Sequence, residues 1–166
     1  MHDVFKGEIL AILPKYISDR GNCTIVVKEE GKTIILNKSI KTTINLLGKY
    51  YMIDLAEVKK RYREIVLSTN LIPIPLSKRD IFVPLKTRYP IFKNDGAFGY
   101  INLRFIEKIK TENLSTMIYL KYGYVIECLS NIDSINHHIK DAKIISRCYE
   151  GYGMEVAEEG ESFRYL

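Results

Sequence analysis

The N-terminal segment of the chain carries its apolar residues in short runs, which is the pattern of β-strands. One run covers residues 7–13 and stops at Pro14, and two runs rich in β-branched residues cover 23–28 and 32–37. Residues 29–31, which separate the last two runs, read Glu-Glu-Gly and favour a turn. We therefore predict three strands, of which the last two form a hairpin.

The spacing of apolar residues then changes to that of helices. Ser39 precedes a short helical repeat that Gly48 is expected to end, and its apolar positions are Ile40, Ile44, Leu46 and Leu47. Asp54 followed by Glu57 resembles a capping box at the start of a second helix, predicted over residues 55–65. The apolar positions of this second helix share one stripe: Leu55, Val58, Tyr62 and Ile65.

Prolines interrupt the middle of the chain, at Pro73, Pro75, Pro84 and Pro90. Because proline is excluded from helix interiors and from central strand positions, we predict edge strands and loops here. The expected strands cover 65–68, 80–83 and 98–104, and Asp95-Gly96 is expected to form a turn that leads into the last of them.

The C-terminal third combines a hairpin with a helix. Residues 115–121 and 124–129 alternate in hydrophobicity on either side of Tyr122-Gly123, which predicts a hairpin. Ser130 is the predicted cap of a third helix that runs to about Cys148. Its apolar stripe is Ile132, Ile135, Ile139 and Ala142.

These elements predict an α+β fold in a single domain, residues 1–148, with a largely antiparallel sheet of short strands and hairpins and about three helices. Residues 149–166 are expected to form a solvated acidic C-terminal tail, with carboxylates at Glu150, Glu155, Glu158, Glu159 and Glu161. The chain shows no signal peptide and no run near the roughly 20 apolar residues that span a bilayer. We expect a cytoplasmic protein without a membrane partner.

Charge is distributed unevenly along the chain. The net charge is +5, but residues 38–110 hold 15 basic against 6 acidic side chains. This window predicts a surface for a polyanion, and duplex DNA is the partner we expect. The candidate DNA-binding residues are Lys59, Lys60, Arg61, Arg63, Lys78, Arg79, Lys86, Arg88 and Lys93.

Within this set, Arg88 is the residue expected to enter a DNA groove. It lies on a loop between Pro84 and Pro90, and a narrow AT-rich minor groove attracts an inserted arginine. Tyr89, Phe92 and Tyr100 are interleaved with the basic residues, and we expect them in the core rather than stacked on bases.

Motifs for chemistry are weak, so no catalytic residues, cofactor or metal site are predicted and the protein is not expected to be an enzyme. Cys23, Cys128 and Cys148 form no Cys-x-x-Cys pair, and adjacent His137 and His138 would diverge on a helix. Glu57-Val58-Lys59 is similar to the Glu-x-Lys of metal-dependent nucleases, but on a helix its two charged side chains diverge as well.

Several segments carry a resemblance to one known family. They are Ala11-Ile12-Leu13-Pro14, Ser39 to Gly48, Ile74-Pro75, Asp80 to Pro84, Gly99-Tyr100-Ile101, and Ser115 to Leu129 followed by the Ser130-led helix through His138. In this order they resemble the ComK competence transcription factor family over residues 9–142. The sequence departs from that family at Lys121-Tyr122-Gly123, at His137 or His138, and at Lys86-Thr87-Arg88.

The resemblance implies a sequence-specific transcriptional regulator that binds AT-rich duplex DNA partly through the minor groove. It also implies a homodimer or larger self-association, and a proteolytic adaptor as a partner. Two alternatives stay open from the residues: an RNA-binding or protein-binding regulatory adaptor, and a metal-dependent nuclease.

Overall fold

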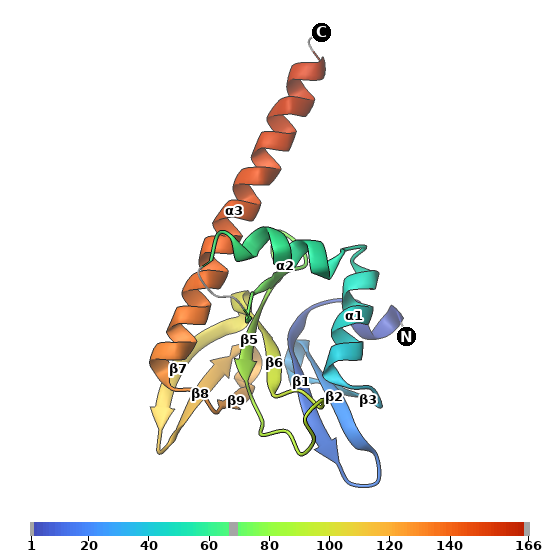
Figure 1. Cartoon of the computed structure of the whole chain (residues 1–166), viewed down its shortest axis with the longest axis vertical. Helices are drawn as coiled ribbons and strands as arrows, with labels where there is room; N and C mark the ends of the chain where they lie inside the picture. Colours follow the sequence, from blue (N-terminus) through green and yellow to red (C-terminus); the bar gives the residue numbers. More distant parts are fainter. Residues whose placement is uncertain (1, 67–69, 165–166) are drawn as a thin grey trace.

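A computed structural model describes residues 2–66 and 70–164 of the chain. Within these residues it contains three α-helices and two antiparallel sheets, which confirms the predicted α+β class (Figure 1). The larger sheet has six strands in the order β3-β2-β1-β6-β5-β4, and the smaller has the order β7-β8-β9.

The strands of the larger sheet are β1 (Ile9–Ile17), β2 (Gly21–Lys28), β3 (Thr33–Leu36), β4 (Ile74–Pro75), β5 (Ile81–Lys86) and β6 (Phe98–Asn102). Those of the smaller are β7 (Ile106–Glu112), β8 (Ser115–Leu120) and β9 (Val125–Cys128). Short 3₁₀ turns flank or join them: η1 (His2–Phe5), η2 (Glu29–Gly31), η3 (Leu103–Phe105) and η4 (Lys121–Gly123). The predicted hairpins around residues 29–31 and 122–123 are confirmed.

Two strands run through prolines at which we expected them to end. Pro14 of β1 pairs with Thr24 of β2, but β1 meets β6 only at Ala11 and Ile12. Pro84 of β5 pairs with Tyr100, whereas the short β4 reaches only as far as Phe82 of β5. Each proline therefore has a partner strand on one side only, which is a setting in which a sheet tolerates a residue without an N–H.

Helix α1 (Ile40–Tyr50) begins as predicted, with the Ser39 side chain accepting a hydrogen bond from the Thr42 backbone N–H. The predicted end at Gly48 is wrong, because the helix continues to Tyr50. A Cβ atom at Gly48 would lie 2.8 Å from the Leu55 Cγ atom, so this glycine permits a close approach of two helices. Helix α2 (Leu55–Arg63) follows, with the Asp54 carboxylate accepting from the backbone N–H groups of Ala56 and Glu57.

Some expected boundaries were wrong. Residues 65–66 form a turn after α2 in place of the predicted strand 65–68, of which residues 67–68 lie outside the described residues. Strand β6 ends at Asn102 because the chain tightens into η3. Strand β7 was missed altogether, because a register shift between Ile106 and Lys108 breaks the alternation that marks a strand.

Helix α3 (Ile132–Arg164) continues past its predicted end at about Cys148 and takes in most of the acidic segment that we expected as a tail. Its cap is Asn131 rather than Ser130, since the Asn131 side chain accepts from the Ser134 N–H at 2.8 Å. The predicted stripe is confirmed for Ile135, Ile139 and Ala142, which are buried.

The core lies on both faces of the larger sheet. One face packs against the smaller sheet and α3, and the other packs against α1 (Figure 1). A third cluster joins Tyr62 of α2 to Ile145 of α3. Among the described residues, the longest helix lacks the apolar stretch that crossing a membrane would require.

Candidate nucleic-acid interface

The nine predicted cations are divided between two ends of the molecule. Lys59, Lys60, Arg61 and Arg63 lie on α2, which crosses the upper end of the body in Figure 1. Lys86, Arg88 and Lys93 lie on β5 and the β5–β6 loop, defined as residues 87–97, which reaches the lower end. Lys78 and Arg79 occupy the turn between β4 and β5, and β4 packs against α2. The sequence window that holds these cations is thus not one continuous surface.

The cations of α2 stand as the predicted helix places them. Lys60, Arg61 and Arg63 are exposed, whereas Tyr62 is buried beneath them. Lys59 is half-buried and lines a small cleft of about 250 Å³ between α1, α2 and Asn94 at the base of the β5–β6 loop. The exposed face of α2 can therefore meet phosphates without disturbing the core.

The turn that carries Lys78 and Arg79 is held by one serine. The Ser77 hydroxyl donates to the Asp80 carboxylate at 3.1 Å and accepts from the backbone N–H groups of Arg79 and Asp80. Both basic side chains are exposed. A turn fixed at its base in this way presents two cations with little freedom left in the backbone.

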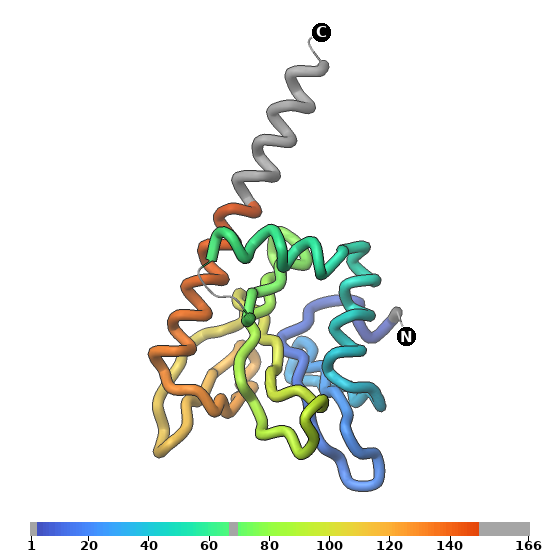
Figure 2. The backbone as a smooth tube through the Cα atoms, in the orientation of Figure 1, coloured from blue at the N-terminus to red at the C-terminus, as the bar shows by residue number. Residues whose placement is uncertain are grey.

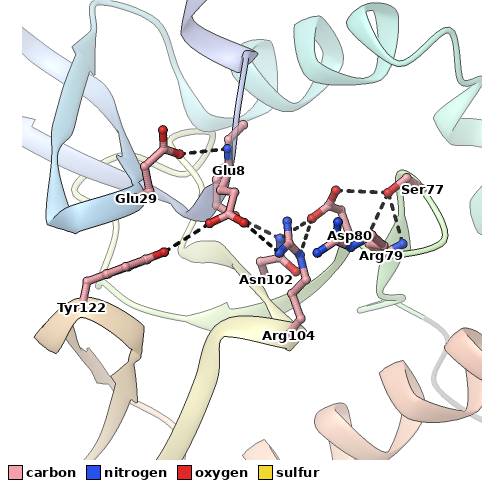
Figure 3. Close-up of polar contacts among 9 residues, drawn as sticks. Glu8, Glu29, Ser77, Arg79, Asp80, Asn102, Arg104 and Tyr122 are labelled. Atoms are coloured by element: carbon pink, nitrogen blue, oxygen red, sulfur yellow. Dashed lines mark hydrogen bonds and ion pairs between the residues drawn. The ribbon is translucent and has the colours of Figure 1, made fainter.

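Asp80 also belongs to a polar cluster beneath this turn (Figure 3). Its carboxylate accepts from the Asn102 amide at 2.8 Å and from the Arg104 guanidinium at 2.9 Å, and Arg104 reaches Glu8 at 3.3 Å. Although burial acts to raise the pKa of Asp80, hydrogen bonds from Asn102, Arg104 and Ser77, with the charge of Arg104, hold it below its ordinary value. The cluster ties β1, β5 and β6 together and keeps this carboxylate ionised.

Arg88 lies on the predicted loop, but its guanidinium is engaged by other groups of the protein. Its Nε donates to the Gly96 carbonyl at 2.8 Å, and its Nη2 donates to the Asp95 carbonyl at 2.6 Å and to Asn22 Oδ1 at 2.8 Å. Its guanidinium carbon lies 4.2 Å from the centroid of the Tyr16 ring. The side chain joins the two ends of the β5–β6 loop to the β1–β2 hairpin, so the structure contradicts an Arg88 that is free to enter a groove.

The tip of the same loop exposes apolar side chains. Tyr89, Ile91 and Phe92 are 71%, 67% and 70% exposed, and Lys93 beside them is exposed too. We expected Tyr89 and Phe92 in the core, and the structure contradicts this. The same expectation is confirmed for Tyr100, which packs against the cluster beneath α1. Lys86, at the start of the loop, places its ammonium 4.7 Å from the centroid of the Tyr89 ring.

Contacts with the neighbouring hairpin hold this tip in place. The Tyr16 hydroxyl accepts from the Ile91 N–H at 2.7 Å and donates to the Asp95 carboxylate at 2.5 Å. A groove of about 480 Å³ separates the tip from the β1–β2 turn and is lined by Ile17, Ile91 and Phe92 among others. Figure 2 shows the loop and this turn projecting together from the lower end of the molecule.

Sequence reasoning missed Tyr16, Asn22 and Ile91. The contacts of Tyr16 and Asn22 with the loop join residues 66 to 79 positions apart, which no local pattern records. A local signal did exist for Ile91: an apolar pair, Ile91-Phe92, directly follows Pro90 inside a basic loop. Exposed apolar residues at such a place indicate a binding surface.

The other candidate chemistry is not assembled into a site. Cys23 and Cys128 are buried, and burial raises the pKa of the Cys128 thiol. Glu57 and Lys59 lie on α2, where positions two apart diverge. Within residues 2–66 and 70–164, His, Cys, Asp and Glu form no group of three that could hold a metal ion.

Comparison with known proteins finds no family model that matches this chain, and no curated protein or solved structure matches it either. The resemblance to the ComK family rests on the residues quoted for it.

Proposed function

We propose that this protein is a transcriptional regulator that binds AT-rich duplex DNA, and that the tip of the β5–β6 loop is the element that enters the minor groove. The observation that carries the proposal is the set of three exposed apolar side chains, Tyr89, Ile91 and Phe92, beside Lys86 and Lys93. Proteins that bind the minor groove often insert apolar side chains between base steps while nearby cations contact the phosphates.

The hydrogen bonds that brace the loop tip are consistent with its insertion into a minor groove. Inserting a side chain between bases requires a loop that resists being pushed back, and Tyr16 and Arg88 brace this loop through hydrogen bonds to Ile91, Asp95 and Gly96. A-tracts present a narrow minor groove of enhanced negative potential, and TA steps are readily kinked or unstacked. In this proposal Arg88 positions the loop and makes no contact with a base.

The cations of α2 and of the β4–β5 turn belong to the proposal as phosphate contacts. Lys60, Arg61, Arg63, Lys78 and Arg79 are exposed on elements away from the loop tip. A single short duplex need not touch both ends of the molecule. Self-association, which the family resemblance implies, would let one copy's α2 contact DNA beside another copy's loop.

The test measures binding of fluorescent AT-rich and GC-rich duplexes by anisotropy, with EDTA present and over a range of salt. Affinity should fall with salt, at a log–log slope near −4 to −5 if about five phosphates are contacted. Exchanging Ile91→Ser together with Phe92→Ser should weaken binding to the AT-rich duplex by about tenfold or more and reduce the preference for it.

Met52→Ser is the matched control, because Met52 is 94% exposed in the connection between α1 and α2. It should bind as the wild type does. A double variant that also binds as the wild type would show that the loop is not the contact. Salt-independent binding would favour a protein partner, equal affinity for RNA would favour an RNA-binding module, and cleavage after addition of magnesium would favour a nuclease.

A further inference from the structure

The cleft of about 250 Å³ between α1, α2 and the base of the β5–β6 loop has mixed walls that suit a small ligand. It lies on the side of the loop that faces α1, whereas the groove at the loop tip faces the β1–β2 turn. Its volume is just below the roughly 300 to 1,000 Å³ of drug-sized sites, so the ligand would be about one ring with a short side chain. The apolar side chains that line it are Ile40, Ile44, Leu55, Ala97, Phe98 and Tyr100.

Two aromatic side chains form part of this lining. Phe98 and Tyr100 are two positions apart on β6, so they project from the same face of the strand, and both are half-buried. A Cβ atom at Gly96 would lie 3.0 Å from Ile40 Cγ2, so the base of the loop packs directly against α1. Two rings on one face favour a flat aromatic ligand, because aromatic rings gain from offset or edge-to-face contacts with each other.

Three charged residues line the cleft: Lys41, Lys59 and Asp95. Lys41 of α1 is exposed and Lys59 of α2 is half-buried, and neither makes an ion pair or a side-chain hydrogen bond within the part of the chain that the structure describes. The Asp95 carboxylate, in contrast, accepts a hydrogen bond from the hydroxyl of Tyr16 on β1. Two lysines against one aspartate give the lining a net charge of +1, and the two ammonium groups are the charges that lack a partner.

The beginning of α1 adds to the positive character of the cleft. Ile40 and Lys41 are the first residues of this helix, and its first turn contains no acidic residue, so the positive end of the helix dipole is not offset there. Two exposed amides, those of Asn45 and Asn94, also line the cleft and can donate hydrogen bonds. The polar part of the lining therefore favours an anion over a neutral or cationic ligand.

We infer that this cleft binds a small aromatic carboxylate, whose ring lies against Phe98 and Tyr100 and whose two oxygens accept from the ammonium groups of Lys41 and Lys59. One negative charge matches the net charge of the lining, and charged donors to a carboxylate make strong hydrogen bonds. A dianion such as a phosphate monoester would carry one charge in excess of the lining and would be repelled by Asp95.

This inference does not rest on the proposed DNA binding, because the ligand is added to the full chain without DNA. The probe is benzoate, and the comparisons are benzyl alcohol, benzylamine and phenyl phosphate, which keep the ring and change the charge. Methyl NMR should show saturable shifts on addition of benzoate at four residues that line the cleft: Ile40, Ile44, Leu55 and Ala97. Benzyl alcohol should bind about tenfold more weakly than benzoate, and benzylamine more weakly still, because both lack the negative charge.

Lys41→Gln with Lys59→Gln removes both cations and keeps side chains of similar length, and it should weaken benzoate binding by about tenfold or more. Lys49→Gln with Lys60→Gln is the matched control, because it makes the same change of charge at exposed positions of the same two helices that do not line the cleft. It should leave the affinity within about twofold of the wild type. Asn45→Trp places a large ring at an exposed position of the lining and should abolish binding.

Several results would overturn the inference. Benzoate that does not bind, or whose methyl shifts are confined to residues outside the cleft, would show that the cleft is not its site. Benzyl alcohol or benzylamine that binds as well as benzoate would refute the role of the charge, and tighter binding of phenyl phosphate would refute the assignment to a carboxylate. Equal losses in the two double variants would mean that overall charge, and not this cleft, attracts the anion.

Discussion

At the scale of single residues, the β5–β6 loop depends on Arg88. Its guanidinium donates three hydrogen bonds that join Asp95, Gly96 and Asn22, and it lies on the Tyr16 ring. We expect Arg88→Ala to lower the free energy of unfolding by about 2 kcal/mol, since it removes charged donors from partly buried carbonyls. Urea unfolding measures this change.

Lys93→Ala is the control for Arg88, because Lys93 is an exposed cation on the same loop. It should change the unfolding free energy by less than about 0.5 kcal/mol. If both variants are equally stable, the hydrogen bonds of Arg88 do not hold the loop.

Asp80 makes stability depend on pH in the acid range. A carboxyl whose folded pKa is depressed binds its proton more weakly when folded, so its contribution is present above the unfolded pKa and is lost as pH falls through the folded pKa. Asp80→Asn should therefore be less stable than the wild type at neutral pH. The difference should shrink below about pH 4.

Unfolding free energies of the two proteins, measured from neutral to acid pH, check this expectation. Asp133→Asn changes a carboxyl in the first turn of α3, outside the cluster of Figure 3, and serves as the comparison. A gap between wild type and Asp80→Asn that stays constant with pH would contradict the role given to the carboxylate.

At the scale of elements, caps, apolar spacing and the positions of proline and glycine predicted most strands and helices. They did not predict where a neighbouring strand or helix allows a proline or a glycine inside an element. The caps at Ser39 and Asp54 and the stripe of α3 could be read from the sequence. The passage of strands through Pro14 and Pro84 could not, because it depends on which neighbouring strands stop short. Gly48 likewise depends on Leu55 of the next helix, rather than on its own backbone preference.

Helix α2 tests whether exposed cations contribute to DNA binding. Lys60→Glu with Arg63→Glu should weaken binding to AT-rich and GC-rich duplexes alike, since phosphate contacts carry no sequence information. The thermal midpoint should barely move, because both side chains are exposed.

The double exchange Lys140→Glu with Lys143→Glu makes the same change of charge at exposed positions of α3 and is the control. It should weaken binding less than the α2 variant does. Equal losses would mean that overall net charge, and not the face of α2, governs the affinity.

At the scale of the whole molecule, the candidate interface was only partly predictable. The distribution of basic residues along the sequence correctly predicted exposed cations on α2 and on the β4–β5 turn. It failed at Arg88, because Asn22 of the β1–β2 hairpin, a distant part of the sequence, holds the guanidinium. The expected burial of Tyr89 and Phe92 failed as well, since the loop leaves both side chains exposed. Charge and periodicity describe what a residue can do locally, whereas packing between hairpins decides whether it is available.

We expect packing around α3 to make the two sheets unfold as one cooperative unit. Ile135 of α3 is fully buried in a cluster that contains Val83 of the larger sheet and Ile118 of the smaller one. Ile135→Asp places an unpaired carboxylate there, and we expect a loss of more than about 4 kcal/mol in the free energy of unfolding. Asn136→Asp adds the same charge at the exposed neighbouring position and should stay within about 0.5 kcal/mol of the wild type.

Amide hydrogen exchange distinguishes a shared core from two independent ones. If the sheets unfold together, Ile135→Asp should remove protection from Val26 of β2 and from Ile118 of β8 to the same extent. Both residues are fully buried and lie in different sheets, and Val26 belongs to the cluster on the face away from α3. Its exchange therefore responds only if damage beneath α3 propagates through the whole larger sheet. Loss of protection at Ile118 alone would show that the smaller sheet with α3 opens by itself, and that the β5–β6 loop can keep its structure on the larger sheet without them.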